Sequence, residues 1–394
     1  MIPHLRSEFN RHFTEEKYQL FLKRLDAICG CHVDFRVSET PVFVPTPLMK
    51  MMEQAGKEII TQLVSNAGYQ KLAAKTIPPE FNAPNETPRP LFAAVDFGLV
   101  KDSDGEIVPK VIEMQGFPSL FCFEPVQCQL FKEVFDLPGE LTYLLGGLNL
   151  DGYYALLRKA ILGGHAPENV VLTELDPDNQ KTRSDFILTE RLCGIRTVNI
   201  RDVIKEGKRL FYMNDRTKTQ ITRIYNRAIA DELVKCGVNL PFSFRDELDV
   251  EWAGHPNWFF RMSKFTLPFL KHPTVPKTTF LHEMKSIPAD LENYVLKPLY
   301  SFAGSGVVVG PTRAEVDAVP ESKRSEYILQ EKVEYAPVVN AIPGPTKAEV
   351  RIMFIWLDEL QPAMNLIRMG RGKMMGVDYN KNLTWVGSSA GLCM

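Results

Sequence analysis

Apolar residues recur at helical spacing in the first part of the chain. One stripe with 3-4-3 spacing lies between Thr14 and Gly30: Tyr18, Phe21, Leu25 and Ile28. A second follows Thr46-Pro47: Leu48, Met51, Met52, Ala55, Ile59 and Leu63. Threonine before such a stripe, proline at its start and glycine after it are typical helix boundaries. We therefore predict two amphipathic helices, followed by an irregular connection through the five prolines of residues 77–90.

Shorter apolar runs with strand character follow. Leu91–Val100 and Ile107–Gln115 flank a turn at Asp102–Gly105, which predicts a β-hairpin. From about residue 153, predicted helices and strands alternate, with strands at 170–172, 195–200, 210–213 and 221–226 and helices at 181–193 and 228–236. This alternation predicts a small open α/β domain. No G-x-G-x-x-G follows its strands, which argues against a dinucleotide site there.

The last third of the chain contains a second hairpin-like unit. Val295–Pro298 and Val307–Val309 flank a loop of small residues, a helix is expected near 313–319, and a further strand spans 327–333. Strands at 350–356 and 362–368 and a Gly-containing loop follow. The closing segment 386–391 consists of small residues, and we expect its neighbouring element elsewhere in the chain.

Composition narrows the class of protein. The 394 residues carry a net charge of −2, which argues against a general nucleic-acid binder. No apolar run has the length of a membrane helix, and no apolar segment of the kind found in signal peptides follows Met1. The seven scattered cysteines indicate reduced thiols and a cytoplasmic location. We read Cys29-Gly-Cys31-His32 as a helix end rather than a zinc site.

Two acids and an amide are expected to share one face of the first hairpin. Asp96 and Glu113 lie at similar distances from the turn, and Gln115 is two residues beyond Glu113. Facing carboxylates destabilise a sheet unless a cation lies between them, and two carboxylates with an amide oxygen suit Mg²⁺. The alternative is a solvated polar face on an edge hairpin.

A lysine beside a small-residue loop is a candidate phosphate site. Lys297 ends the first strand of the second hairpin, and glycines in the loop let backbone amides approach an anion. The alternative is an ordinary turn. No Walker A motif occurs in the chain.

The order of these motifs resembles the ATP-grasp superfamily, in its circularly permuted form. Lys264 precedes the turn Val275-Pro276-Lys277-Thr278, Lys297-Pro298 begins a flap, and a second strand ends at 330–333. In particular, residues 90–394 resemble the synthetase domain of glutathionylspermidine synthase and, more distantly, eukaryotic glutathione synthetase.

The resemblance implies a fold and a set of site residues. The fold class is α/β (α+β), a circularly permuted ATP-grasp fold with a small open α/β domain and a flap or lid subdomain. The implied cofactors are ATP and Mg²⁺, and the implied catalytic residues are Arg368 and Lys297. The implied metal ligands are Asp96, Glu113 and Gln115. The implied nucleotide-binding residues are Lys264, Lys297, Ala303, Gly304, Ser305, Gly306, Gln330, Glu331, Lys332 and Val333.

The implied domain division has five parts. These are an N-terminal helical region (1–90), a metal-binding hairpin part (91–150), a small α/β domain (151–255), a nucleotide-binding lid (256–345) and a C-terminal part of the core (346–394). Asn226-Arg227 is a candidate for acceptor binding, and His255 and Trp258 are expected to pack at a domain junction. Arg371, Lys373, Asn380 and Ser388 are further candidates near the end of the site.

The implied reaction is ATP- and Mg²⁺-dependent ligation of a carboxylate to an amine through an acyl phosphate. The expected partners are small-molecule or short-peptide substrates, without nucleic acid or membrane, in an undetermined oligomeric state. The sequence departs from the family pattern, because Gln115 replaces an asparagine, Ala94 an arginine and Ala303 an acid. These departures leave two alternatives open: a nucleotide-binding pseudoenzyme with a regulatory or scaffold role, and a small-molecule phosphotransferase.

Overall fold

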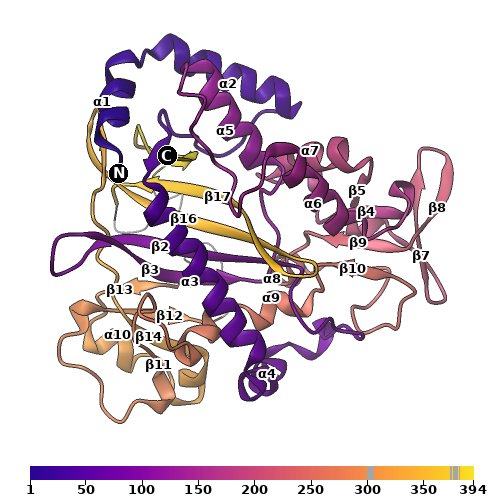
Figure 1. Cartoon of the computed structure of the whole chain (residues 1–394). Coiled ribbons are helices and arrows are strands. Elements are labelled where there is room, and N and C mark those ends of the chain that lie inside the picture. The colour runs from indigo at the N-terminus through magenta and orange to yellow at the C-terminus, as the bar shows by residue number, and fades with distance from the viewer. Residues whose placement is uncertain (300–305, 373–374, 376–379, 381) are drawn as a thin grey trace.

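The computed structural model describes residues 1–299, 306–372, 375, 380 and 382–394. At its centre lies an antiparallel sheet with the strand order β18-β17-β16-β2-β3, to which β15 adds by pairing with β16 (Figure 1). The strands are β2 (Phe92–Lys101), β3 (Ile107–Gln115), β15 (Val339–Ala341), β16 (Gly344–Trp356), β17 (Leu360–Gly370) and β18 (Gly387–Ser389). The predicted hairpin thus forms two strands of a larger sheet, completed by the C-terminal third of the chain.

The N-terminal helices pack around this sheet. Helix α2 (Glu15–Cys29) begins after Thr14, whose side chain accepts from the Lys17 amide, and ends at the left-handed Gly30, as predicted. The other helices of this part are α1 (Pro3–His12), α3 (Thr46–Ser65), α4 (Ala67–Ala73) and α5 (Phe123–Val134). Helix α3 crosses the sheet diagonally in Figure 1 and packs against alternate residues of its strands, such as Val95 and Ile352. The opposite face of the sheet is thereby left for α5 and for polar residues.

Two predicted core positions are wrong. Ile28 and Met51 are 38% and 46% exposed. The other predicted core residues of α3 are buried, and the buried face also includes Met49, Gly56 and Ile60.

The expected small α/β unit is present beside the central sheet. Its four strands are all parallel in the order β10-β9-β4-β5. They are β4 (Val170–Glu174), β5 (Arg196–Asn199), β9 (Arg223–Asn226) and β10 (Glu251–Ala253), with α6 (Leu150–Leu162), α7 (Arg183–Cys193) and α8 (Ala230–Lys235). A three-stranded meander of β6 (Ile204–Glu206), β7 (Arg209–Asn214) and β8 (Thr217–Ile221) extends from it at the right of Figure 1.

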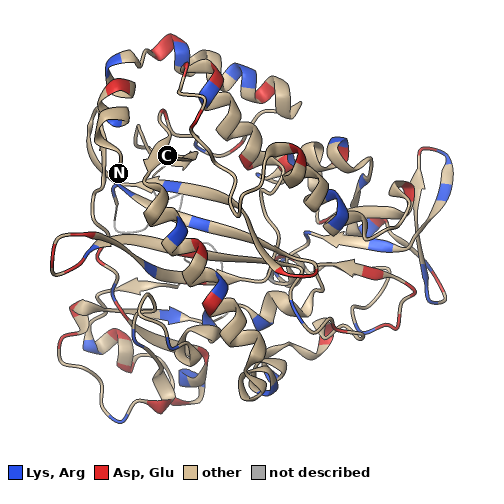
Figure 2. Ribbon diagram, in the orientation of Figure 1, with Lys and Arg blue, Asp and Glu red and all other residues tan. Residues whose placement is uncertain are grey.

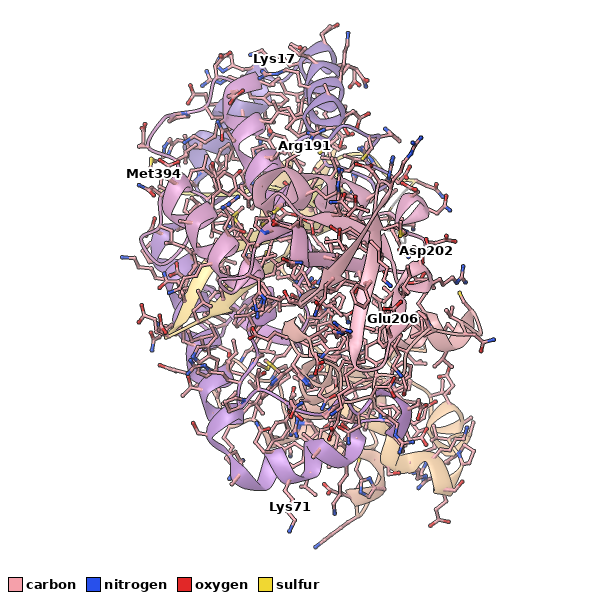
Figure 3. The ribbon with its side chains drawn as sticks, turned by 90° about the vertical axis from the view of Figure 1, so that its right-hand side faces the viewer. Lys17, Lys71, Arg191, Asp202, Glu206 and Met394 are labelled. Atoms are coloured by element: carbon pink, nitrogen blue, oxygen red, sulfur yellow. The ribbon has the colours of Figure 1, made fainter. Side chains whose placement is uncertain are left out.

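One contact ties this unit to the N-terminal helices. Arg191, at the end of α7, donates to the Ile28 carbonyl at the end of α2. Arg191 lies in the upper half of Figure 3, between the labelled Lys17 and Glu206.

The lid unit forms a separate antiparallel sheet in the order β11-β14-β12-β13. Its elements are β11 (Thr278–Phe280), β12 (Tyr294–Pro298), β13 (Val308–Val309), α10 (Arg313–Asp317) and β14 (Tyr327–Glu331), preceded by α9 (Asn257–Arg261) and a 3₁₀ helix, Lys264–Phe269. In Figure 1 it lies below β3, the edge strand of the central sheet. The Val111 amide of β3 donates to the Thr274 carbonyl at 2.8 Å, so the lid and this edge are in direct contact.

The C-terminal segment pairs with a distant element, as expected. Strand β19 (Gly391–Cys393) lies parallel to β1 (Val42–Val44), and Ser388 of β18 bridges to Val37. Both ends of the chain therefore lie on the same side of the central sheet (Figure 1). Among the described residues, no helix has the length and apolar character that a membrane span requires.

We predict that Gly56→Ala destabilises the fold. A methyl group at Gly56 would lie 2.6 Å from the ring of Phe354, so the added atom overpacks the contact between α3 and the sheet. Overpacking costs about 1–3 kcal/mol, which exceeds the roughly 1 kcal/mol that alanine gains in helix propensity. Urea unfolding should show a net loss for Gly56→Ala and a partial recovery in Gly56→Ala/Phe354→Leu. Equal or greater stability of Gly56→Ala would contradict this packing.

Candidate functional site

The central sheet places the predicted metal ligands together on one face. Asp96 of β2 lies directly opposite Glu113 of β3, and Gln115 is opposite Ala94. Gln115 Nε2 donates to Glu113 Oε1 at 2.9 Å. The expected cross-strand pairing of the two acids is therefore confirmed, while their role in metal binding stays a prediction.

Asp96 is held by two arginines from neighbouring strands. Arg351 of β16 lies directly opposite Asp96 and donates from Nε to Oδ1 at 2.6 Å and from Nη2 to Oδ2 at 2.7 Å. Arg368 of β17 also donates to Oδ2. The Asp96 side chain is only 1% exposed. Burial alone would raise the pKa of Asp96, but the two guanidinium groups lower it below its usual range. Asp96 is therefore an ionised, buried carboxylate.

A second acid completes this charged cluster. Glu349 lies opposite Arg368 in the β16–β17 pairing, and Arg368 Nη2 lies 2.5 Å from Glu349 Oε1. The Tyr335 hydroxyl donates to the other oxygen of Glu349. A Cβ atom at Gly98 would lie 2.9 Å from the Tyr335 ring, so glycine is needed there for the ring to reach Glu349. In Figure 2, β16 and β17 carry blue segments within a largely tan sheet.

Lys297 lies where the lid meets the edge of the central sheet. Its Nζ donates to Gln330 Oε1 at 2.6 Å and to the Ile112 carbonyl at 3.3 Å, at the point where the β2–β3 register shifts. The pKa of Lys297 is lowered to about 8, chiefly by burial; the nearby Glu113 opposes this effect, and Lys264 adds to it. Lys264 itself is buried at the start of its 3₁₀ helix. The structure thus brings Lys297 near both Lys264 and Glu113.

The chemistry of these groups fits only part of the predicted magnesium site. Both Asp96 oxygens accept from guanidinium groups, so Asp96 offers no free oxygen to a cation in this arrangement. Glu113 is 27% exposed, and Gln115 beside it is half-buried, so these two can face a ligand. In the part of the chain that is described, no group of three His, Cys, Asp or Glu residues is arranged to hold a metal.

The remaining nucleotide-binding candidates lie along the lid. Gln330 donates from Nε2 to Thr278 Oγ1 at 3.1 Å, and Glu331 pairs through its backbone with Lys277. The Lys332 amide donates to the Asn293 carbonyl, and Val333 follows at the end of β14. Gly306 has a φ of 71° and lies beside Pro298. Ala303, Gly304 and Ser305 lie outside the described residues.

The candidate acceptor residues lie at the carboxyl end of the small parallel sheet. Arg227 follows β9, is 3% exposed and donates to the Pro118 carbonyl beneath the ring of Phe117. Its Nε has no hydrogen-bond partner within the described structure. Burial raises the pKa of the neighbouring Glu174 to about 8, while Arg227 opposes that effect. The adjoining cavity, lined in part by Phe117 and Asn226, has a volume of only about 20 Å³.

Other sequence candidates have structural partners. His255 and Trp258 are buried and bond to the connecting segment at the Pro84 and Thr87 carbonyls, which confirms their expected packing role. Asn380 Oδ1 accepts from the Arg371 amide, and the Arg371 side chain donates to the Thr384 carbonyl. Ser388 donates to Gln127. Lys373 lies outside the described residues. Arg89, the arginine that precedes Ala94 most closely in the sequence, donates to the Leu357 carbonyl.

A larger cavity lies away from the charged cluster. It has a volume of about 620 Å³ and lies between the proline-rich connection, β10 and the β16–β17 turn, with Trp252 and Trp356 in its lining. Of the sequence candidates that the structure describes, His255 lines it, whereas the predicted metal, nucleotide-binding and catalytic residues do not.

Sequence reasoning missed Arg351, Glu349 and Tyr335. Glu349 and Arg351 are two residues apart in the segment 348–356, which is otherwise apolar, so their side chains share a face. Charged residues at alternate positions of a buried strand were the available signal. The partner of Arg351, Asp96, lies 255 residues away along the chain, beyond any local pattern.

Comparison with known proteins supports the fold. No family model and no curated protein sequence matches the chain. A glutathione synthetase-like effector from Globodera pallida, solved in its apo form, has a similar fold. The TM-score is 0.58 at 12% identity, over 97% of this chain and 98% of that one. A putative gamma-glutamylcysteine synthetase from Methylobacillus flagellatus covers 85% of this chain at 12% identity, with a TM-score of 0.37. The predicted α/β (α+β) fold class is therefore confirmed, as a fold similar to that of a glutathione synthetase-like protein.

We predict that Asp96→Ala lowers the free energy of unfolding by about 3–5 kcal/mol, because it leaves two partly buried guanidinium groups without their carboxylate. Asp358→Ala is the matched control, since Asp358 is 93% exposed and pairs with Lys159 at 3.5 Å. Exposed pairs contribute about 0–1 kcal/mol. Urea unfolding measures both changes, and losses of similar size in the two variants would contradict the assignment.

We predict that Lys297 makes stability rise with pH in the alkaline range. Its folded pKa of about 8 lies below its ordinary value of 10.5, so between these values the unfolded chain binds a proton that the folded chain lacks. Relative to Lys297→Met, the wild type should gain about 3 kcal/mol as pH rises through this window. Urea unfolding of both proteins at several pH values gives the difference. If the difference in free energy of unfolding between the two proteins stayed constant or fell with pH, the pKa of Lys297 would not be lowered in the folded protein.

Proposed function

We propose that this chain binds ATP between the lid and the β3 edge of the central sheet, and uses it to join a carboxylate to an amine through an acyl phosphate. The observation that carries the proposal is the convergence of Lys264, Lys297 and Arg368 at this junction, each on a different element. The fold shared with a glutathione synthetase-like protein supports a ligase of this class.

The local charge suits a polyphosphate. Asp96, Glu113 and Glu349 supply three carboxylates, while two arginines and two lysines supply four positive groups, so four minus three leaves one positive charge. Burial increases the electrostatic effect of each group, because little water screens it. An anion bound here would also raise the pKa of Lys297 and keep it protonated.

Each residue of the junction has a proposed task. Lys264 and Lys297 would bind phosphate oxygens by charge-assisted hydrogen bonds. Arg368 would stabilise the charge of the transferred phosphoryl group, and its pairs with Asp96 and Glu349 fix its position. Gly306, at the end of the segment that follows β12, would lie near the phosphates, and the segment 330–333 would contact the adenine.

Glu113 and Gln115 are the residues that would hold Mg²⁺. Magnesium is commonly bound by one or two protein oxygens together with nucleotide phosphates, so a two-residue site is sufficient. The metal would supply neutralisation of charge on the phosphates. Asp96 would act at a distance by positioning Arg351 and Arg368.

The acceptor substrate would bind near Arg227. Ligands of open α/β sheets bind outside the carboxyl ends of the strands, and both Arg227 and Glu174 lie at such ends. The unpartnered Nε of Arg227 leaves one donor for a substrate carboxylate. Small molecules or short peptides are the substrate class that this region would accept.

Two observations favour a second function, a nucleotide-binding protein without ligase activity. Ala94 replaces the arginine expected beside the metal site, and Asp96 is withdrawn from it by arginines. Such a protein would bind ATP in the same place and act as a regulator or scaffold.

Nucleotide binding provides the first test. Mg·ATP at millimolar concentration should raise the melting temperature of the wild type, because it binds the folded state preferentially. Lys297→Met should reduce the shift strongly, whereas Lys323→Met, an exposed lysine of the same lid, should preserve it. Calorimetric titration near pH 8.5, in buffers of different ionisation enthalpy, should show proton uptake on binding that is absent in Lys297→Met. Absence of any shift in the wild type would refute the nucleotide site.

Product analysis separates the two functions. A ligase should release ADP and phosphate only when a suitable carboxylate and amine are both present, and Arg368→Met should lower that rate at least about a hundredfold, as for loss of a transition-state donor. Arg11→Met, on the exposed end of α1, serves as the control. Nucleotide binding without ADP release across a broad panel of amino acids, peptides and amines would instead support the non-catalytic function.

A further inference from the structure

The facing acids Asp96 and Glu113 already have a cation between them. A carboxylate pair directly across two strands is destabilising unless positive charge compensates it. Arg351 supplies that charge from the strand on the other side of β2, at the position directly opposite Asp96. A positive charge that compensates the facing acids is therefore present as a side chain of the protein.

The geometry of Arg351 is that of a bridging group. Its Nη2 lies 2.7 Å from Asp96 Oδ2 and 3.9 Å from Glu113 Oε1, so one nitrogen approaches both carboxylates. Its Nε donates a hydrogen bond to the other oxygen of Asp96, Oδ1, at 2.6 Å. The Arg351 side chain is only 9% exposed, so the guanidinium is fixed among these groups and is not a surface ion pair.

Arg368 is the second guanidinium group that contacts Asp96. It reaches Asp96 Oδ2 on one side and Glu349 Oε1 on the other, and Glu349 in turn accepts from the Tyr335 hydroxyl. Each of these three carboxylates is therefore within reach of a guanidinium group, and Glu113 alone is substantially exposed.

We propose that Arg351 is a resident cation that replaces a divalent metal between Asp96 and Glu113. Asp96 is then a positioning residue, and the metal capacity of the site is limited to Glu113 and Gln115. This role of Arg351 rests on the proposed function, because it concerns which groups neutralise charge in the same nucleotide site. Fixed guanidinium charge supplies part of the neutralisation that a second metal ion would otherwise provide to a bound polyphosphate.

Removing the guanidinium should convert the pair of acids into a metal site. In Arg351→Ala, Asp96 and Glu113 lose the bridging charge and leave a space between two carboxylates. Mn²⁺ without nucleotide is the probe, with free Mn²⁺ measured by electron paramagnetic resonance. Arg351→Ala should bind Mn²⁺ about tenfold more tightly than the wild type, since a carboxylate ligand is added to the site.

Two further variants make the test specific. Arg351→Ala/Asp96→Asn should return to wild-type Mn²⁺ affinity, because the gained ligand is removed. Arg351→Lys keeps a positive charge at this position and should show no gain. Circular dichroism spectra confirm that each variant is folded before titration. No gain in Arg351→Ala, or a gain that survives Asp96→Asn, would overturn the proposal.

If Arg351→Ala does not fold, the proposal can be tested with variants that retain Arg351. With Arg351 in place, Glu113→Gln should weaken Mn²⁺ binding, whereas Asp96→Asn should leave it within about twofold of the wild type, because Asp96 contributes no ligand. Mn²⁺ binding that depends on Asp96 would overturn the proposal. Since these titrations contain no nucleotide, their outcome is independent of whether the chain binds ATP.

Discussion

The central sheet contains a buried carboxylate, Asp96, whose negative charge must be balanced by positive groups on neighbouring strands. Asp96 has almost no exposed surface and accepts hydrogen bonds from two arginines on two different strands. A buried charge is tolerated only when it is paired and hydrogen-bonded, and its loss leaves the partners uncompensated. The same requirement fixes the register of β2 against β16, because a shift by one residue would turn Arg351 to the opposite, apolar face.

That constraint also determines what lies on each face of the sheet. Alternate residues such as Val95 and Phe97 pack beneath α3, and Asp96 and Gly98 face the other way. Because Gly98 admits the ring of Tyr335, a second acid, Glu349, is hydrogen-bonded within the same cluster. The lid joins this face at the β3 edge, where Lys297 bonds to the Ile112 carbonyl. A charged face, a buried lysine and a lid are thus connected through a few side chains.

The local parts of this structure could be predicted from the sequence. The Thr14 and Gly30 boundaries of α2 are determined by neighbouring residues, and the hairpin register beside the turn follows from the turn itself. Asp96 was predictable as a near neighbour of Glu113, but it lies directly opposite Glu113 only because the register shifts between Asp96 and Phe97. The exposure of Met51 was not predictable, because tertiary packing, such as that of Gly56 close to Phe354, decides which residues at the border of the α3 stripe are buried.

The candidate site was predictable only in part. The lysines and the acids of the hairpin carry a recognisable order along the chain, and the structure brings Lys264, Lys297 and Glu113 together. The cation for Asp96 was expected to be a metal, because the partner strand β16 lies more than 200 residues away and its register is set by tertiary packing. Sequence patterns identify which residues need compensation, whereas the fold decides which group provides it.

The most direct measurement is a crystal structure of the chain with a non-hydrolysable ATP analogue and Mn²⁺, with the metal located by anomalous scattering. The account predicts phosphates beside Lys264 and Lys297, and Mn²⁺ on Glu113 and Gln115 with Arg351 still bound to Asp96. A nucleotide in the cavity between Trp252 and Trp356, or Mn²⁺ bound by Asp96 with Arg351 displaced, would contradict it.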